Sequence, residues 1–274
     1  MTAVLTTRPA PPPTVRIALA RVRLELRLFA RERQQVVFVF AYPVVMLVIF
    51  ASVLGSDERP GGIPFTQYFL AGIAATGIML TSFQAVGTSI AAERETGLLE
   101  RLQLLGTPPA AYFGGKAGQV LVTTALQLAV LLPVAHYGYD VPLPVDLGHW
   151  LTFLWVAALG ALAGTVLGIA VSALPGSASS VNTAVSAFAI VLQFFSGVFF
   201  GFLELPGCMQ QVAAVFPLKW LTQGMRSAFL PDGAGAFEVA GSWEHARTAA
   251  VLVAWVIIGV VVCARTFRWR RSEG

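Results

Sequence analysis

The densest run of charged side chains between apolar segments is ERETGLLERLQLLGTP, at residues 93–108. As a helix, it places Leu98, Leu102 and Leu105 on one face, while glutamates and arginines occupy the others. A Gly-Thr-Pro-Pro run then ends the helix and turns the chain back. A short amphipathic helix of this kind can bind another protein through ion pairs and an apolar ridge. The alternative is a solvated loop whose charges only hold the topology.

Other chemistry finds less support in the residue pattern. The only Gly-Lys pair, Gly115 with Lys116, is followed by Ala and lacks the spacing of a phosphate-binding loop. We therefore expect no nucleotide hydrolysis and no cofactor in this chain. The two cysteines have no partner at ligand spacing, which predicts no metal site. A membrane-embedded enzyme, for example a lipid-modifying one, is the alternative class, and its nearest cluster of suitable side chains is His136, Asp140, Asp146 and His149.

The elements that carry these residues are membrane spans. Of the 274 residues, 56% are hydrophobic and 12% are charged, whereas soluble proteins have about 25% charged residues. A hydrocarbon core about 30 Å thick is crossed by about 20 apolar residues in a helix. The pattern predicts an all-α membrane protein with six spans, at 35–55, 66–91, 109–137, 150–173, 181–203 and 248–267.

The basic residues predict the orientation of these spans. Lys and Arg favour the cytoplasmic side of a membrane, and 14 of the 18 fall on the side that both termini share. We therefore expect cytoplasmic termini and a cytoplasmic 93–108 segment. The arginines flank apolar spans, which argues against nucleic-acid binding. No span has an ionisable residue in its middle third, which disfavours coupling to an ion gradient.

Polar and small residues inside the spans predict contacts between helices. Amide side chains at depth can form hydrogen bonds from one helix to another. Glycines at four-residue spacing allow close packing, either within the chain or between two chains. The amides are Gln84, Gln127, Asn182 and Gln193, and the glycines are Gly160, Gly164 and Gly168.

The chain divides into three expected parts: a disordered tail at 1–14 that includes APPP, an amphipathic helix at 15–33, and one transmembrane domain at 34–274. The helix can lie in the membrane interface with its arginines near lipid phosphates. The alternative is a solvated helix packed on a partner. Its apolar stripe is Val15, Leu19, Val22, Leu26 and Phe29, and the flanking arginines are Arg16, Arg23 and Arg27.

The segment ERETGLLERLQLLGTPPAAYFGGK resembles the characteristic segment of permease subunits in the type-2 family of ATP-binding cassette exporters. The matching positions are Glu93, Arg94, Gly97, Glu100, Leu102, Thr107 and Pro108. The resemblance implies a coupling helix that rests in a groove of a separate ATPase subunit, and Glu95 and Arg101 belong to the same expected site. It makes the 15–33 helix similar to the family's interfacial connecting helix.

The resemblance also implies partners and a location. ATP and magnesium would be bound by the ATPase subunit, and a second permease chain would complete a homo- or heterodimer in the plasma membrane of a bacterial cell. The cargo would be hydrophobic or amphipathic, a drug-like molecule or lipid rather than a polysaccharide. A scaffold that docks a cytoplasmic partner without transport is a third possibility.

A second, weaker resemblance lies in AAVFPLKWLTQGMRSAFL, at residues 213–230. It implies short helices that re-enter the outer leaflet as part of an extracellular gate, with Pro217, Trp220 and Arg226 as the matching positions. The alternative is a loop folded over the outer surface. The polar loop at 231–247 departs from the family pattern and receives no role.

An aromatic run, QFFSGVFFGF, ends the fifth predicted span. Its phenylalanines could line an apolar exit for the substrate, or could face lipid or pack between helices. They are Phe194, Phe195, Phe199 and Phe200.

Overall fold

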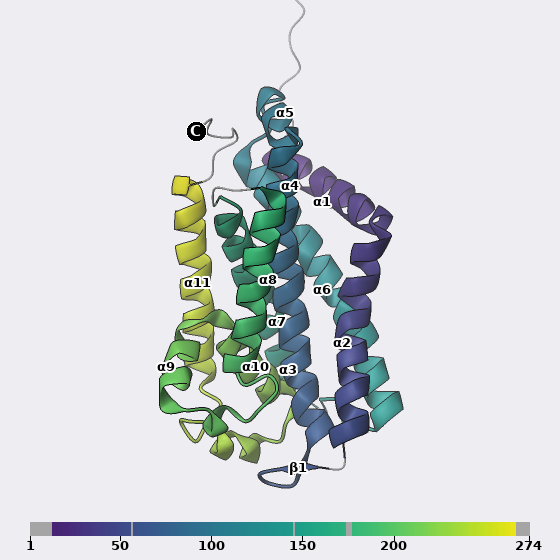
Figure 1. Cartoon of the computed structure of the whole chain (residues 1–274), viewed down its shortest axis with the longest axis vertical. Coiled ribbons are helices and arrows are strands. Elements are labelled where there is room, and N and C mark those ends of the chain that lie inside the picture. Colours follow the sequence, from purple (N-terminus) through teal and green to yellow (C-terminus); the bar gives the residue numbers. More distant parts are fainter. Residues whose placement is uncertain (1–12, 56, 145, 174–176, 267–274) are drawn as a thin grey trace, which may run out of the picture.

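The computed structural model describes residues 13–55, 57–144, 146–173 and 177–266. Its described part contains six helices that are long and apolar enough to cross a membrane (Figure 1). The second of them is continuous from Phe65 to Glu95 and includes a π-helical turn, η1. The spans are α2 (Arg33–Leu54), α3 (Phe65–Met79) with η1 (Leu80–Gln84) and α4 (Ala85–Glu95), α6 (Pro109–Tyr139), α7 (Leu147–Ser172), α8 (Ala178–Phe195) and α11 (His245–Thr266).

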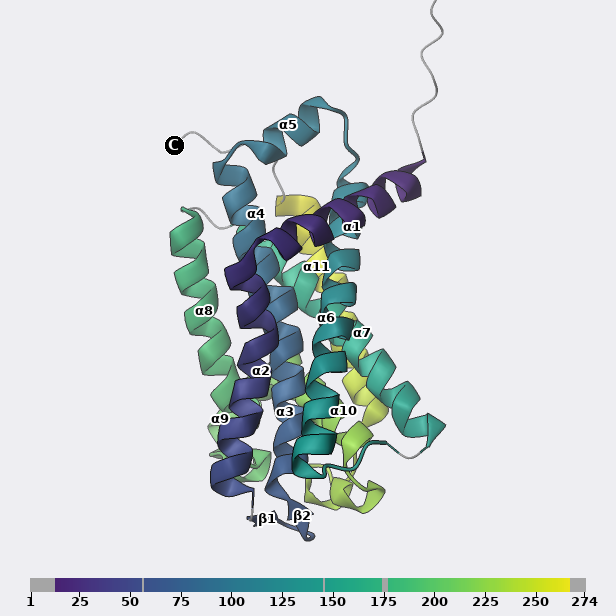
Figure 2. The ribbon, with the colours of Figure 1, turned by 90° about the vertical axis from the view of Figure 1, so that its right-hand side faces the viewer.

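The shorter elements gather at the two ends of the bundle. At one end, α1 (Thr14–Arg31) lies across the spans and α5 (Leu98–Leu104) projects beyond them (Figure 2). The opposite end holds a two-stranded antiparallel hairpin in which Glu58 pairs with Pro64. We call these the α5 end and the hairpin end. The hairpin end contains β1 (Glu58–Arg59), β2 (Ile63–Pro64), η2 (Phe202–Glu204), α9 (Gly207–Val215), α10 (Pro217–Phe229) and η3 (Asp232–Phe237).

The second span forms the centre of the bundle. In its most apolar stretch of 18 residues, 83% of the residues are buried, compared with 22% in the same length of α2 and 28% in α8. The residues that α2 and α8 expose include Val45, Ile49, Ile190 and Val191. Apolar residues left exposed on the outside of a bundle suit contact with lipid or with another span.

Close packing of α7 against the second span depends on its glycines. A Cβ at Gly164 would lie 1.9 Å from the Oγ atom of Ser82, and one at Gly168 would lie 2.6 Å from the carbonyl oxygen of Phe83. Both neighbours belong to η1, so the four-residue glycine spacing serves contacts within the chain. Gly160 likewise faces Leu221 of α10.

Three of the four predicted amides form hydrogen bonds between helices, whereas Asn182 accepts its hydrogen bond from Ser186 of the same helix. Pro43 lies inside α2 and has no N–H to donate to the carbonyl of Val39. Gln127 of α6 donates its Nε2 to that carbonyl at 2.7 Å. The carbonyl that proline leaves without an N–H donor is therefore satisfied by a helix packed beside α2. Gln84 similarly donates to Ser186 of α8 at 2.8 Å, and Tyr42 of α2 donates to Gln193 at 3.1 Å.

Five of the six predicted spans agree with the structure to within a few residues, and the fifth is wrong at its end. We expected a helix to residue 203, but α8 ends at Phe195. Gly197 follows with a φ of +71°, a left-handed conformation that breaks the helix. At the N-terminus, α1 begins at Thr14 and most of the predicted tail lies outside the described residues.

Candidate functional site

The helix α5 projects from the bundle on two glycine turns. Gly97 and Gly106 flank it with φ values of +71° and +69°, which favour glycine because a side chain is strained there. Leu99 and Leu102 face inward and are buried. Thr107 closes the second turn by donating its backbone N–H to the carbonyl of Leu102 at 3.1 Å, and Pro108 is the N-cap of α6.

The outward face of α5 is charged and apolar at once. Leu104 and Leu105 are 82% and 79% exposed. Glu100 and Arg101 are also exposed, and neither forms an ion pair with any residue that the structure describes. This face is the part of the predicted coupling site that is available to a partner.

The remaining charges of the predicted coupling site point into the chain. Arg94 donates to the carbonyl of Ser172, at the end of α7. Glu95 accepts the N–H of Ala178, at the start of α8, at 3.2 Å. Glu93 bonds to α6. The Glu-Arg-Glu sequence therefore fixes the end of the second span to three other spans, and the docking role of these residues stays a prediction.

Glu93 belongs to a closed ring of four charges drawn from α1, α4 and α6, of which Arg21, Glu25 and Lys116 are buried and Glu93 is partly buried. Lys116 Nζ lies 2.8 Å from Glu25 Oε2 and 2.5 Å from Glu93 Oε1. Arg21 lies 2.9 Å from Glu25 and 3.8 Å from Glu93. Tyr112 donates its hydroxyl to Glu93 at 2.7 Å. We call Arg21, Glu25, Glu93 and Lys116 the ion ring; its formal charge is zero, which is the condition under which buried ions are tolerated.

Glycines of α6 let α1 approach closely enough to complete the ring. A Cβ at Gly115 would lie 2.4 Å from Cγ of Arg21, and one at Gly118 would lie 2.5 Å from Cγ2 of Val22. The inward face of α1 is therefore centred on Arg21 and Glu25. Part of the predicted apolar stripe faces outward instead, since Val15 and Leu19 are 70% and 65% exposed.

Sequence reasoning missed the ring, because it treated charges near span ends as markers of orientation. Two signals were present in the sequence. Arg21 and Glu25 are spaced as an i, i+4 ion pair, and Lys116 lies beside two glycines within an apolar segment.

A cavity of about 720 Å³ opens beside the ring. Its wall combines apolar side chains with many amides and hydroxyls, and it includes Glu25, Ser89 and Glu93, so that the ring forms part of the wall. The cavity is lined by α1, α2, the second span and α6, and α8 borders it through Asn182. Its polar lining residues include Gln34, Gln35, Thr81, Gln84, Gln119, Gln127 and Asn182.

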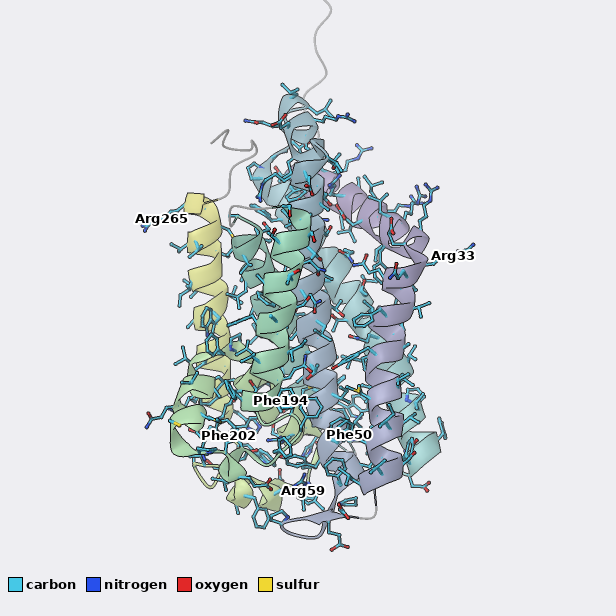
Figure 3. The ribbon with its side chains drawn as sticks, in the orientation of Figure 1. Arg33, Phe50, Arg59, Phe194, Phe202 and Arg265 are labelled. Carbon is cyan, nitrogen blue, oxygen red and sulfur yellow. The ribbon has the colours of Figure 1, made fainter. Side chains whose placement is uncertain are left out.

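An aromatic cluster lies nearer the hairpin end, between α2, the second span and the end of α8. Phe199 lies 5.2 Å from Phe194, 5.5 Å from Phe50 and 6.0 Å from Phe69, between ring centroids. Figure 3 places Phe50 and Phe194 toward the end that holds Arg59, away from Arg33 and Arg265.

Only two of the four predicted path residues join this cluster. Phe194 and Phe199 do so. Phe195 and Phe200 make no ring contact with the other described residues, and Phe200 is 49% exposed.

The three predicted gate residues belong to α10 at the hairpin end, and all three are buried. Pro217 is the first residue of α10, and Trp220 donates its Nε1 to the carbonyl of Ala214 at 2.8 Å. The Arg226 guanidinium lies 3.9 Å from the ring centroid of Tyr68 and 3.3 Å from the carboxylate of Glu238. It also donates to the carbonyl of Gly197.

The loop at 231–247 takes part in this packing. It supplies Glu238 to Arg226, and the carbonyl of Trp243 accepts a hydrogen bond from Gln223 at 3.1 Å. Trp243 also packs with Ile63 and Leu230 in a small separate core. The loop therefore covers α10, a role that its polar sequence did not indicate.

Lys219 is a second buried cation of α10. Its Nζ lies 3.8 Å from the ring centroid of Trp220 and 5.1 Å from that of Phe202, and it donates to Gln223. Burial lowers the pKa of Lys219 to about 8. It forms no ion pair within the described part of the chain.

The enzyme alternative gains no supporting cluster. His149 contacts Asp146 at 2.8 Å and Asp232 at 3.5 Å, and His136 contacts the carbonyl of Val141. Throughout the described ranges, no group of three or more His, Cys, Asp or Glu residues could hold a metal ion.

The described part of the chain, with six candidate spans, a polar cavity and a projecting amphipathic helix, defines a multi-pass α-helical membrane protein. A family model described as ABC-2 family transporter protein matches residues 61–265, which is more than half of the chain. The chain therefore belongs to the ABC-2 transporter family and is a membrane permease of an ATP-binding cassette transporter, whose partner is an ATP-binding cassette subunit. No curated protein matches the chain.

Proposed function

We propose that this permease moves a hydrophobic or amphipathic substrate outward, using ATP and magnesium bound by the separate ATPase subunit, with its α5 end in the cytoplasm. The order of cavity and aromatic cluster along the helices supports this proposal. On α2 the cavity is lined by residues 34–42, and the cluster uses Phe50. On the second span and α8, too, the cavity-lining residues lie nearer the α5 end, and the cluster residues Phe69 and Phe194 lie nearer the hairpin end. A substrate could therefore enter near the α5 end, while packed aromatic rings close the way toward the hairpin end.

The same geometry supports a route for mechanical work. An ATPase that moves α5 would move the adjoining ends of the second and third spans. The ion ring ties those two ends to α1, and two of its members, Glu25 and Glu93, also line the cavity. Displacement of α5 would therefore reach the cavity wall directly.

A second permease chain would complete the path. The cavity lies between α2 and α8, and both of these helices are mostly unburied in the single chain. A homo- or heterodimer that joined these two faces would enclose the cavity and shield its polar groups from lipid.

Cysteine labelling in cells tests the proposed orientation. Native Cys208 of α9 is exposed at the hairpin end, whereas Cys263 is buried. A membrane-impermeant maleimide should label the wild type in intact cells through Cys208. A variant with Cys208→Ser and Leu104→Cys should be labelled only after permeabilisation. The reverse pattern would place α5 outside the cell and overturn the proposal.

A charge reversal on α5 tests the docking role. Glu100→Arg should leave the fold intact because Glu100 is exposed. It should lower the amount of ATPase subunit that copurifies by about tenfold, since like charges placed together at an interface cost several kcal/mol. The matched control is Glu58→Arg, a reversal of another exposed glutamate at the hairpin end. Equal copurification of both variants would count against docking at α5.

A further inference from the structure

We infer that the cavity accepts an amphipathic organic cation, a class of substrate that the family match does not specify. The inference rests on the proposed function, because it takes the cavity to be the substrate site. Three features of the wall carry it: hydrogen-bonding groups without partners, apolar surface beside them, and an excess of carboxylates.

The cavity wall has more hydrogen-bonding side chains than the bundle uses in its own hydrogen bonds. Gln127 is occupied by its bonds to Val39 and Thr81. By contrast, the side chains of Gln34, Gln35 and Gln119 form no hydrogen bond with any other residue that the structure describes. Gln34 is exposed and Gln35 and Gln119 are partly buried, so their amides are free to form hydrogen bonds with a ligand in the cavity. A ligand with polar substituents fits this wall better than a plain hydrocarbon does.

The π-helical turn places polar and apolar groups side by side in the wall. Thr81 and Gln84 of η1 line the cavity, while Ser82 and Phe83 of the same turn pack against α7. Turns of this kind often occur at functional sites. Phe38 and Tyr42 of α2 provide aromatic surface that also lines the cavity, so an apolar ring system can be accommodated beside the amides.

The charges of the wall are all negative. Glu25, Glu32 and Glu93 line the cavity, and no Lys or Arg is among the described residues that do so. Two of these carboxylates are already neutralised within the ion ring. Glu32 lies at the junction of α1 and α2, is exposed, and forms no ion pair with another described residue. It is therefore the carboxylate available to a bound cation.

A pair of dyes that differ in charge tests this inference directly. Rhodamine 6G is a permanent cation, and fluorescein is an anion built on the same xanthene ring system. Fluorescence polarisation would measure the binding of each dye to the full chain in nanodiscs, with empty nanodiscs as the blank. We expect saturable binding of rhodamine 6G and little binding of fluorescein.

Variants at Glu32 then identify the counter-ion. Glu32→Gln should weaken rhodamine 6G binding roughly fivefold, the effect of removing one partly exposed charge at contact distance. Glu32→Lys should weaken it further and should improve fluorescein binding. The control is Glu58→Gln, which removes an exposed carboxylate far from the cavity and should change nothing.

The outcomes separate this inference from the proposed function. Equal binding of the two dyes, or unchanged rhodamine 6G binding by Glu32→Gln, would overturn the assignment of a cation. Copurification of the ATPase subunit would still support the transport proposal in that case. Charge-selective dye binding together with a failure of any ATPase subunit to copurify with the chain would instead support the cation site and contradict ATP-driven transport.

Discussion

Two lysines are buried in this molecule, one near each end, and their surroundings differ. Lys116 at the α5 end is 1% exposed and lies against two carboxylates. Lys219 at the hairpin end is 5% exposed, and its neighbours are an amide and two aromatic rings. The first is an ion within a neutral network, whereas the second is a cation with no ionic partner in the described part of the chain.

The difference indicates what each end is built to do. Ion pairs in the ring join three separate elements, so the lysine holds α1 and the second and third spans in one arrangement. Lys219 bonds mainly within α10, since Gln223 and Trp220 belong to the same helix. Replacement of Lys116 should therefore weaken the packing of the bundle, while replacement of Lys219 should affect only the packing around α10.

The largest expected effect is the loss of the ring lysine. Lys116→Met leaves two carboxylates facing a single cation, Arg21, and breaking a buried ion pair in this way costs about 3–5 kcal/mol. We expect the melting temperature in detergent to fall by roughly 10 °C. The matched variant Lys219→Met removes a buried cation that has no carboxylate partner, and such a replacement is close to neutral or stabilising. Its melting temperature at neutral pH should therefore equal or exceed that of the wild type.

An equal fall in melting temperature in the two variants would show that the ion ring stabilises the protein no more than ordinary packing does. A third variant keeps that test informative. Arg101→Met removes an exposed positive charge from α5, so it reports the effect of net charge alone. We expect no change in its melting temperature.

The sequence allowed the spans to be predicted well because their length and apolar character are set by the membrane. The break after α8 was missed because its cause, the left-handed Gly197, lies within an apolar run and looks like any other glycine of a span. The contacts of Gly164 with Ser82 could not be assigned to one chain or two, since spacing alone does not reveal which helix lies opposite.

The site was predicted less completely than the fold, for a related reason. The exposed charges of α5 follow from its amphipathic pattern, but that pattern also placed Leu105 on the face of Leu102, whereas Leu102 is buried and Leu105 is 79% exposed. The inward half depends on where separate helices meet. Glu25 contacts Lys116 only because Gly115 allows α1 to approach, and the cavity exists only because α2 and α8 remain apart beside it. Such distances are properties of the assembled bundle.

The smaller expected effect sharpens the comparison through pH. Because burial lowers the pKa of Lys219 to about 8, the unfolded chain binds a proton more strongly at this site than the folded chain does. Folding is therefore disfavoured at this lysine below about pH 8, and the penalty is relieved as the pH rises toward the ordinary lysine pKa of about 10.4. Between about pH 7.5 and about pH 9.5 the wild type should gain about 2 kcal/mol of stability from this residue.

The measurement is the difference in melting temperature between the wild type and Lys219→Met at those two pH values, since other titrating groups are common to both proteins. The wild type should rise relative to the variant by roughly 5 °C. Parallel curves would mean that Lys219 is solvated in the folded protein, and the contrast between the two lysines would then disappear. The sign is also diagnostic: a lysine held by carboxylates would have a raised pKa, so its contribution to stability would be lost, rather than gained, as the pH increases.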